Sequence, residues 1–174
     1  MSSDLRSPEA LEYLKITKHK ELITNAITAA IAPDLYQSGL AAIERLKLGE
    51  GLNKILPCVQ LWVSVYSGVA LIVNRVTPSH RDPGAAPSSY DFFVAGGDHQ
   101  QCTLDCADIG ARFSYLPGTA IAISGKILRH SVHDWKGGER ICVAHFIKDA
   151  VHARLMQPRP SWPMHADYLA LTRK

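Results

Sequence analysis

The sequence predicts an α+β protein with a mainly β core, folded as a double-stranded β-helix, or jelly roll. Two observations lead to this prediction. From residue 57 onward, short runs rich in valine, isoleucine and aromatic residues are separated by glycine, proline, aspartate and serine. The first 50 residues instead have apolar residues at helical spacing. Many short strands without helices between them are typical of sandwiches and barrels, and we expect the N-terminal helices to pack on the larger sheet.

Two helices are expected before the strands. Ser7 and Pro8 supply a capping hydroxyl and a proline at the first helical position. Pro33 ends this helix and begins the next, which Gly49 and Gly51 terminate. Apolar stripes of helical spacing are formed in the first helix by Leu22, Ile23, Ala26, Ile27, Ala30 and Ile31, and in the second by Tyr36, Leu40, Ile43 and Leu46.

Eight strands are expected after residue 57, each a short apolar run bounded by turn-forming residues. A short helix and an extended, proline-containing tail follow them. The expected strands are 59–66, 69–77, 90–95, 101–106, 112–116, 119–124, 130–135 and 140–147, and the expected helix is 150–156.

The composition is that of a soluble globular protein. The 174 residues suit a single domain, with helical support over 1–50, a jelly-roll core over 57–148 and a C-terminal helix and tail over 149–174. Apolar residues make up 47% and charged residues 20% of the chain. The formal net charge of +3 permits a polyanionic partner without requiring one.

The four cysteines are too few for a disulfide scaffold, which predicts reduced thiols and an intracellular protein, nuclear or cytoplasmic. Cys102 and Cys106 are spaced like half of a zinc site, but the sequence has no second closely spaced cysteine pair to complete it. We therefore interpret them as small buried residues. The N-terminus lacks the pattern of a secretory signal. The apolar stretch 56–73 is interrupted by polar residues, which argues against a membrane span.

A metal-ligand pattern lies at the end of one predicted strand. His80 and Asp82 are two residues apart, so both side chains can point to one face of an extended chain. A later strand carries His130, far enough along the chain for the intervening strands of a jelly roll. Two histidines and one carboxylate form the facial triad of non-haem iron(II) sites, although zinc or manganese can use the same ligands.

An arginine ten residues after His130 sharpens this hypothesis. If Arg140 begins the next strand, it shares a face with Cys142 and Phe146 and points into an apolar barrel, which is costly unless an anion pairs with it. Its guanidinium suits the distal carboxylate of 2-oxoglutarate. An arginine on the rim of the turn is the alternative. His133, a rival ligand, lies only seven residues from Arg140 and on the opposite strand parity, which favours His130.

Iron(II), 2-oxoglutarate and dioxygen together define the expected chemistry. Three protein ligands leave three coordination positions, of which 2-oxoglutarate takes two and dioxygen one. Oxidative decarboxylation of 2-oxoglutarate then drives removal of a hydrogen from a C–H bond. The alternatives are the same chemistry on a protein side chain or small metabolite, and a catalytically silent metal-binding jelly-roll module.

At these residues the chain resembles the TET/JBP group of iron(II)- and 2-oxoglutarate-dependent dioxygenases, and within it the fungal branch. The resemblance implies oxidation of a methyl group on a nucleic-acid base: 5-methylcytosine, thymine or N6-methyladenine. The partner would be methylated DNA, RNA or a nucleotide, and a base in a duplex would be flipped into the pocket. The resemblance spans about residues 68–155 and is carried by segments 67–75, 80–82, 90–91, 117–119, 124–130 and 140–144.

The resemblance also implies further cosubstrate contacts. Arg75 precedes His80 by five residues and matches a family arginine near the metal pocket, where contact with the substrate is the alternative to contact with the cosubstrate. With Arg140, we assign Arg75, Asn74 and Cys142 to cosubstrate binding.

Three more residues are implied for the substrate. Phe146 falls where the family has an aromatic that stacks on the flipped base, and filling the end of the barrel is the alternative role. Lys148 replaces a family histidine that hydrogen-bonds the base. Because a lysine can only donate, this departure leaves the identity of the base open. Asp149 is then a candidate acceptor for an exocyclic amine.

Two features surround the expected site. The loop 83–89 consists of small residues and is a candidate lid, although turn chemistry alone also explains it. Arg81, Lys126 and Arg129 should point away from the metal, where they are candidates for a phosphate-binding rim or for a solvated surface.

Overall fold

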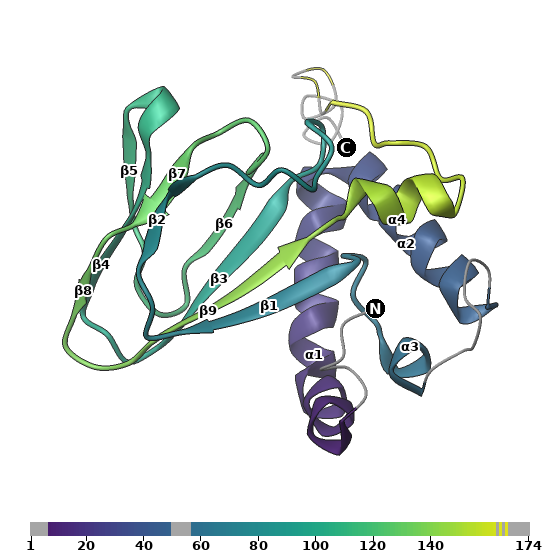
Figure 1. The fold of residues 1–174 in the computed structure, drawn as a ribbon, viewed down its shortest axis with the longest axis horizontal. Coiled ribbons are helices and arrows are strands. Elements are labelled where there is room, and N and C mark those ends of the chain that lie inside the picture. The colour runs from purple at the N-terminus through teal and green to yellow at the C-terminus, as the bar shows by residue number, and fades with distance from the viewer. Residues whose placement is uncertain (1–6, 50–56, 163, 165, 167–174) are drawn as a thin grey trace. The chain divides into compact units, whose positions relative to one another are not determined.

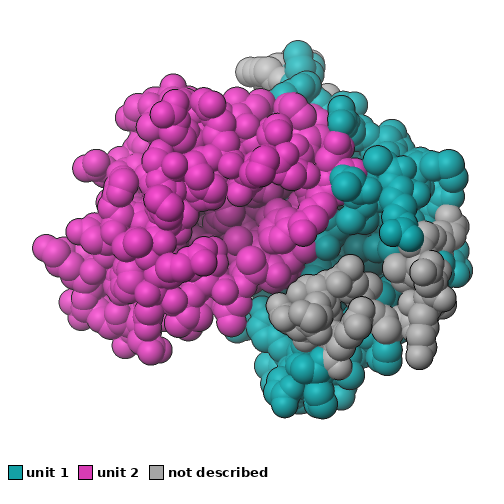
Figure 2. All heavy atoms as spheres, in the orientation of Figure 1, with its two compact units in different colours: residues 1–67, 150–174 teal, residues 68–149 magenta. Residues whose placement is uncertain are grey.

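The computed structural model describes residues 7–49, 57–162, 164 and 166. The chain divides into two compact units, which Figure 2 colours separately. Unit 1 comprises residues 1–67 and 150–174, and unit 2 comprises residues 68–149. The expected single domain, and the packing of the helices on the larger sheet, stay predictions.

Unit 1 is helical, as the apolar spacing predicted. The helices are α1 (Pro8–Ile31), α2 (Pro33–Lys47) and α3 (Pro57–Leu61), with α4 (Asp149–Arg154) returning after the strands (Figure 1). The Ser7 hydroxyl accepts a hydrogen bond from the Ala10 backbone N–H at 3.2 Å and caps α1. Gly51, expected as part of the second helix end, lies outside the described residues. In the described part of the chain, no helix has the length and apolarity needed to cross a bilayer.

The buried face of α1 differs from its apolar stripe. Leu22 and Ile23 are 47% and 61% exposed, whereas Thr17 and Thr28 are buried. A buried threonine is tolerated because its hydroxyl donates to a backbone carbonyl one turn earlier, as Thr17 does to Tyr13 at 2.7 Å. Apolar spacing therefore predicted the helix correctly but did not identify the side that is buried.

The first predicted strand, 59–66, is wrong. Its beginning belongs to α3, where Pro57 occupies the first helical position, and its remainder is irregular. The Asn25 side chain occupies the backbone groups that a strand would need: it donates to the Val63 carbonyl at 2.7 Å and accepts from the Val65 N–H at 3.0 Å. An apolar run of this length is compatible with a helix or a strand, and contacts distant in sequence decide between them.

Unit 2 consists of two antiparallel sheets that face each other (Figure 1). The four-stranded sheet has the order β1-β9-β3-β6, and the second has the order β2-β7-β4-β5, with β8 also pairing with β4. The strands are β1 (Gly68–Val73), β2 (Thr77–His80), β3 (Asp91–Gly97), β4 (Gln101–Cys106), β5 (Ala111–Ser114), β6 (Ala120–Ile123), β7 (His130–Val132), β8 (Trp135–Lys136) and β9 (Arg140–Phe146), with a short 3-10 helix, η2 (Ala107–Ile109), between β4 and β5.

One hydrophobic core lies between these sheets. Phe93 and Ala144 contribute to it from the four-stranded sheet, and Leu104 and Val132 from the other. Strand alternation sends every second side chain of β3, β4 and β9 inward, which produces the jelly-roll core that the sequence predicted.

Two predicted strands are divided in the structure. The expected strand 69–77 breaks at Asn74, whose φ of 49° lies in the left-handed region, so that β1 and β2 join different sheets. The expected strand 130–135 divides into β7 and β8. The first break matters most, because it carries the chain from one sheet to the other immediately before His80.

Candidate active site

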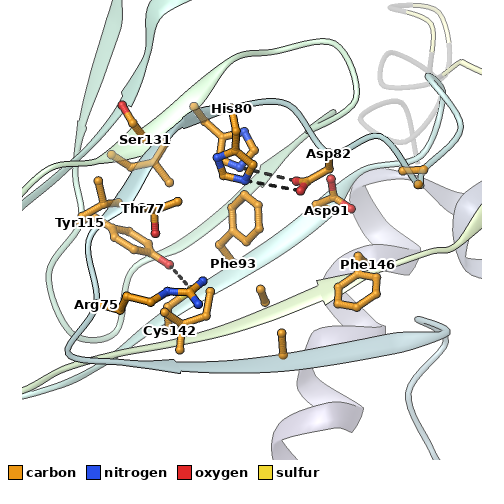
Figure 3. A pocket seen from close by; sticks show the side chains of 18 of the residues that line it. Arg75, Thr77, His80, Asp82, Asp91, Phe93, Tyr115, Ser131, Cys142 and Phe146 are labelled. Atoms are coloured by element: carbon orange, nitrogen blue, oxygen red, sulfur yellow. Dashed lines mark hydrogen bonds and ion pairs between the residues drawn. The ribbon is translucent and has the colours of Figure 1, made fainter. Parts of the chain in front are cut away.

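A cavity of about 310 Å³ lies inside unit 2 and is lined by residues of both sheets. Figure 3 shows its side chains, and Figure 2 shows a hollow in the surface of unit 2. His80, Asp82 and His130 line it, and Figure 3 labels the first two. Tyr115 and Cys142 lie on one side of them and Phe146 on the other, which gives the cavity two chemically different ends (Figure 3).

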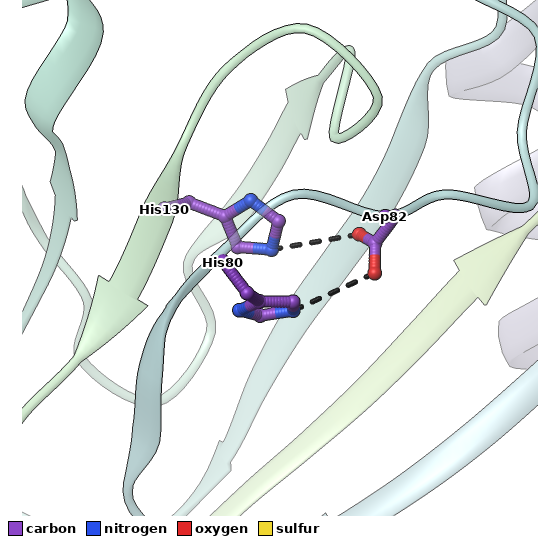
Figure 4. Close-up of side chains that lie close together, drawn as sticks. All are labelled: His80, Asp82 and His130. Carbon is purple, nitrogen blue, oxygen red and sulfur yellow. Dashed lines mark ion pairs between the residues drawn. The ribbon is translucent and has the colours of Figure 1, made fainter.

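The three predicted metal ligands come together. Nε2 of His80 lies 3.5 Å from Oδ1 of Asp82, and Nε2 of His130 lies 3.5 Å from Oδ2 of the same carboxylate (Figure 4). One ligand atom from each residue lies within 4.8 Å of the others, and the described residues contain no other such cluster of three. These side chains could hold a divalent cation between them.

Both histidines are oriented by the backbone. The Nδ1–H of His80 donates to the Pro78 carbonyl at 2.9 Å, and that of His130 donates to the Leu128 carbonyl at 3.1 Å. A carbonyl can only accept, so these contacts assign the proton to Nδ1 and leave a lone pair on each Nε2. Metal-ligating histidines are commonly fixed in this way.

The electrostatics of His130 favour the neutral, ligating form. Its side chain is almost fully buried, and burial lowers the pKa of the imidazole below its usual value. The Leu128 carbonyl and Asp82 raise the pKa and oppose this effect in part, whereas His80 adds to it. A neutral imidazole is the form that binds a metal.

Asp82 is held beyond the end of β2 by a contact with Gly125. The Asp82 N–H donates to the Gly125 carbonyl at 2.8 Å. A Cβ at position 125 would collide with the carboxylates of both Asp82 and Asp91, so a larger residue here would displace them.

Asp91, at the start of β3, is a buried carboxyl that sequence reasoning did not identify. It lines the cavity beside Asp82 and is fully buried. Burial, and secondarily the charge of Asp82, raise the pKa of Asp91 to about 8, and the Gly125 backbone N–H lowers it only in part. A bound divalent cation would act in the opposite direction to Asp82.

Arg140 begins β9 and is only 2% exposed. Its Nη1 donates to the Arg75 carbonyl at 2.8 Å, whereas its Nε has no partner among the described residues. The guanidinium carbon lies 5.8 Å from the centre of the Tyr115 ring and 6.0 Å from that of Trp135. A buried guanidinium with an unused donor, in a cavity wall, is suited to bind a carboxylate.

The other predicted cosubstrate residues surround Arg140. Arg75 and Cys142 line the cavity, and the Tyr115 hydroxyl donates to Cys142 Sγ at 3.2 Å. Asn74 is not part of the cavity lining. Its side-chain oxygen accepts from the Arg140 N–H at 2.9 Å, and its own N–H donates to the Arg140 carbonyl at 2.8 Å. Asn74 therefore supports the arginine through the backbone.

The predicted substrate residues lie at the end of β9 and directly after it. Phe146 and Lys148 line the cavity, and the Lys148 ammonium lies 5.7 Å from the centre of the Phe146 ring. Gly68, paired with Phe146 across β1 and β9, leaves room for this ring, since a Cβ there would collide with it. Asp149 is not part of the lining; its backbone N–H donates to the Gly84 carbonyl at 2.9 Å.

The loop 83–89 is held in place rather than open. Lys126 Nζ donates to the Pro83 carbonyl at 2.9 Å, and the Ser124 hydroxyl donates to the Pro87 carbonyl at 2.7 Å. Ala85 and Ala86 are 7% and 2% exposed. With these contacts the loop forms part of the cavity wall. Its motion as a lid stays a prediction.

Residues that sequence reasoning considered as alternatives lie elsewhere. The side chain of His133 is 65% exposed and contacts Ser131 and Asp105. Cys102 and Cys106 are buried thiols, in line with their interpretation as small core residues.

A comparison with protein families matches residues 2–149 of the chain to Tet_JBP, the oxygenase domain of the 2OGFeDO superfamily. A comparison with curated proteins gave no match. Among solved structures, NgTET1 in complex with 5mC DNA aligns with a TM-score of 0.60 at 15% identity, covering 99% of this chain and 62% of that chain. At this identity the likeness shows the fold, and the chain spans less than two thirds of the NgTET1 chain.

Two weaker structural matches cover only parts of the chain. A cupin 2 conserved barrel domain protein from Salinispora arenicola has a TM-score of 0.36 at 18% identity, covering 55% of this chain and 76% of that chain. A putative mannose-6-phosphate isomerase from Ralstonia eutropha has a TM-score of 0.35 at 16% identity, covering 45% of this chain and 72% of that chain. Neither carries weight in the assignment.

Proposed function

Because the chain belongs to the Tet_JBP family and is therefore a 2-oxoglutarate- and iron(II)-dependent dioxygenase domain, we propose that it hydroxylates a methyl group on a nucleic-acid base, giving succinate and CO2. The candidate bases are 5-methylcytosine, N6-methyladenine and thymine. One observation carries the proposal: a single cavity combines a His-Asp-His cluster, a buried arginine with an unused donor, and an aromatic side chain.

We assign iron(II) to His80, Asp82 and His130. Two neutral imidazoles and one carboxylate are the donor set of non-haem iron(II) oxygenases, and the Nδ1 contacts leave both Nε2 atoms available to a metal. When bound, iron(II) supplies the activation of dioxygen that oxidation of an unactivated C–H bond requires. The protein supplies the geometry: it fixes both imidazoles, and through Gly125 it fixes the carboxylate.

We assign 2-oxoglutarate to the end of the cavity that contains Arg140. The distal carboxylate would satisfy the unused Nε of Arg140 and offset the cost of burying its charge. Arg75 and Cys142 complete this end of the cavity, and Asn74 holds the backbone of Arg140. The Tyr115 hydroxyl, which now donates to a weakly accepting sulfur, is a further donor for the same carboxylate.

We assign the base to the end of the cavity that contains Phe146. Stacking of a base on this ring would stabilise binding by roughly 1–3 kcal/mol. Lys148 would donate to a base acceptor or a phosphate, and Asp149 would accept from an exocyclic amine after a local rearrangement. A base in a duplex must leave the stack to reach a metal inside a cavity. The NgTET1 structure with 5mC DNA supports a nucleic-acid substrate for this fold.

The test is substrate-stimulated turnover. The protein is incubated with iron(II), 2-oxoglutarate and oligonucleotides that contain 5-methylcytosine, N6-methyladenine or thymine, and succinate and the oxidised base are followed by mass spectrometry. Oligonucleotides with cytosine, adenine or uracil at the same position are the matched controls, and RNA and free nucleotides are tested in parallel. We expect at least one methylated base to raise succinate formation above its control. If none does, the nucleic-acid assignment fails.

A further inference from the structure

Asp108, in η2, contacts two arginines that adjoin the metal ligands in sequence. One of its carboxylate oxygens accepts from Arg81 Nη2 at 2.9 Å and from the Arg129 backbone N–H at 2.7 Å. Its other oxygen lies 3.5 Å from Arg129 Nη2. One carboxylate therefore connects two segments that are far apart in sequence.

These two segments carry all three candidate metal ligands. Arg81 lies between His80 and Asp82, and Arg129 directly precedes His130. A shift of either arginine backbone would move the adjacent ligand atoms. Asp108 is thus attached to the neighbours of the ligands and not to the ligands themselves.

Backbone pairing alone holds the two segments weakly. β2 and β7 pair only at Thr77↔Val132 and His80↔His130, with a register irregularity between these positions. Asp82 lies beyond the end of β2. Regular ladder hydrogen bonds therefore do not fix the spacing between Asp82 and His130. Besides the hydrogen bond from the Asp82 N–H to the Gly125 carbonyl, side-chain contacts connect the two segments.

Two further contacts strengthen the connection. Arg81 Nε donates to the Ile127 carbonyl at 2.7 Å, so the same guanidinium contacts both η2 and the loop before His130. The Ala107 N–H donates to the Arg129 carbonyl at 3.1 Å. The Arg129 N–H contact, and then the Arg81 hydrogen bond, lower the pKa of Asp108, so the carboxylate stays charged at neutral pH.

We propose that Asp108 is a positioning residue of the metal site: through Arg81 and Arg129 it sets the separation of the His80–Asp82 segment from His130. The inference rests on the proposed assignment of iron(II) to these three ligands. It also revises the role of two arginines that sequence reasoning considered for a phosphate rim, because both contact Asp108.

The test compares two matched substitutions by their metal affinity. Asp108→Asn keeps the shape of the side chain and removes the charge. Asp105→Asn is the control, since Asp105 lies on the preceding strand and its carboxylate contacts Arg112 at 2.7 Å and His133 at 3.8 Å, not Arg81 or Arg129. Mn²⁺ and Co²⁺ binding are measured by titration calorimetry, and the Co²⁺ electronic spectrum reports the coordination geometry.

We expect Asp108→Asn to weaken Mn²⁺ binding up to about 10-fold and to change the Co²⁺ spectrum; this is the lower limit of the loss for direct partners of metal ligands, because Asp108 acts through the residues next to them. The control should retain the wild-type affinity, and the thermal stability of both metal-free variants should be similar. Equal metal affinity of the two variants would overturn the inference.

Two more variants separate a positioning role from general destabilisation. Arg81→Ala should also weaken Mn²⁺ binding, and the double variant Asp108→Asn/Arg81→Ala should lose less than the sum of the two single losses, because both substitutions remove the Asp108–Arg81 contact. Additive losses would contradict the proposal. His130→Ala tests the underlying site: normal metal affinity in that variant would remove the iron assignment itself, whereas a loss there with none in Asp108→Asn would remove only the role of Asp108.

Discussion

The arginine end of the cavity (Arg140, Tyr115 and Cys142) and its aromatic end (Phe146 and Lys148) are built in different ways. Arg140 is 2% exposed and is held by Arg75, by Asn74 and by the core. Phe146 is only partly buried, and Lys148 is exposed. A dense set of contacts suits a constant cosubstrate, whereas an exposed end can change its substrate without disturbing the metal site.

Substitutions between the two ends, at the metal cluster, should abolish turnover with every substrate. Substitutions at the aromatic end should instead change substrate choice and leave metal and 2-oxoglutarate binding intact.

The largest effect is expected for Asp82→Ala. Removing one of three ligands should abolish metal-dependent succinate formation while the fold persists, because Asp82 is only partly buried. Circular dichroism checks the fold, and Mn²⁺ titration checks the site. His133→Ala is the control, since this exposed histidine lies outside the cluster. Normal turnover by Asp82→Ala would exclude this residue as a ligand.

A similarly large loss is expected for Gly125→Ala. The new methyl group would collide with the carboxylates of Asp82 and Asp91 and displace the metal ligand. Gly84→Ala provides a matched comparison, because a Cβ at position 84 meets no atom within 4 Å. We expect Mn²⁺ affinity to fall strongly in the first variant only. Equal affinities would mean that Gly125 does not set the position of Asp82.

An intermediate and selective effect is expected for Phe146→Ala. Loss of base stacking costs roughly 1–3 kcal/mol, which lowers kcat/KM for a methylated oligonucleotide about 5- to 160-fold. The KM for 2-oxoglutarate should stay unchanged. Phe113→Ala serves as the control, because Phe113 lies on β5 and is 38% exposed. A parallel rise in the 2-oxoglutarate KM would remove the distinction between the two ends.

The last effect concerns stability and not activity, and it is a pH dependence of unfolding in the metal-free protein. The pKa of Asp91 is raised from 3.8 to about 8, so between these values the folded state binds more protons than the unfolded state. Its contribution to stability is therefore present below pH 4 and is lost as the pH rises toward 8. Urea unfolding at pH 5 and pH 8 measures this loss, and Asp91→Asn should reduce it. An unchanged pH dependence would show that Asp91 is not its source.

Sequence reasoning was most successful where spacing within one strand determines direction. His80 and Asp82, two residues apart, do face one cavity, and Arg140 does begin a strand and point inward. Alternation along an extended chain is a local property, so it can be predicted without knowledge of the partner strands.

Contacts between distant residues could not be predicted in the same way. The Asn25 side chain hydrogen-bonds the Val63 carbonyl and the Val65 N–H, which a strand would need for pairing. The sequence near residue 63 does not indicate this distant contact. Asp91 and Asp108 gain their roles from neighbours in space. A buried aspartate at the start of a strand has the same local pattern as an exposed one.

The most direct test of the account is 2-oxoglutarate binding in the presence of Mn²⁺ by wild-type protein, Asp82→Ala and Arg140→Ala. We predict that Arg140→Ala retains Mn²⁺ but binds 2-oxoglutarate at least about thirtyfold more weakly, since truncating one partner of a buried charge pair costs roughly 2–5 kcal/mol. Asp82→Ala should lose both ligands. If Arg140→Ala bound 2-oxoglutarate as tightly as the wild type, the cavity would not hold metal and cosubstrate in the way described.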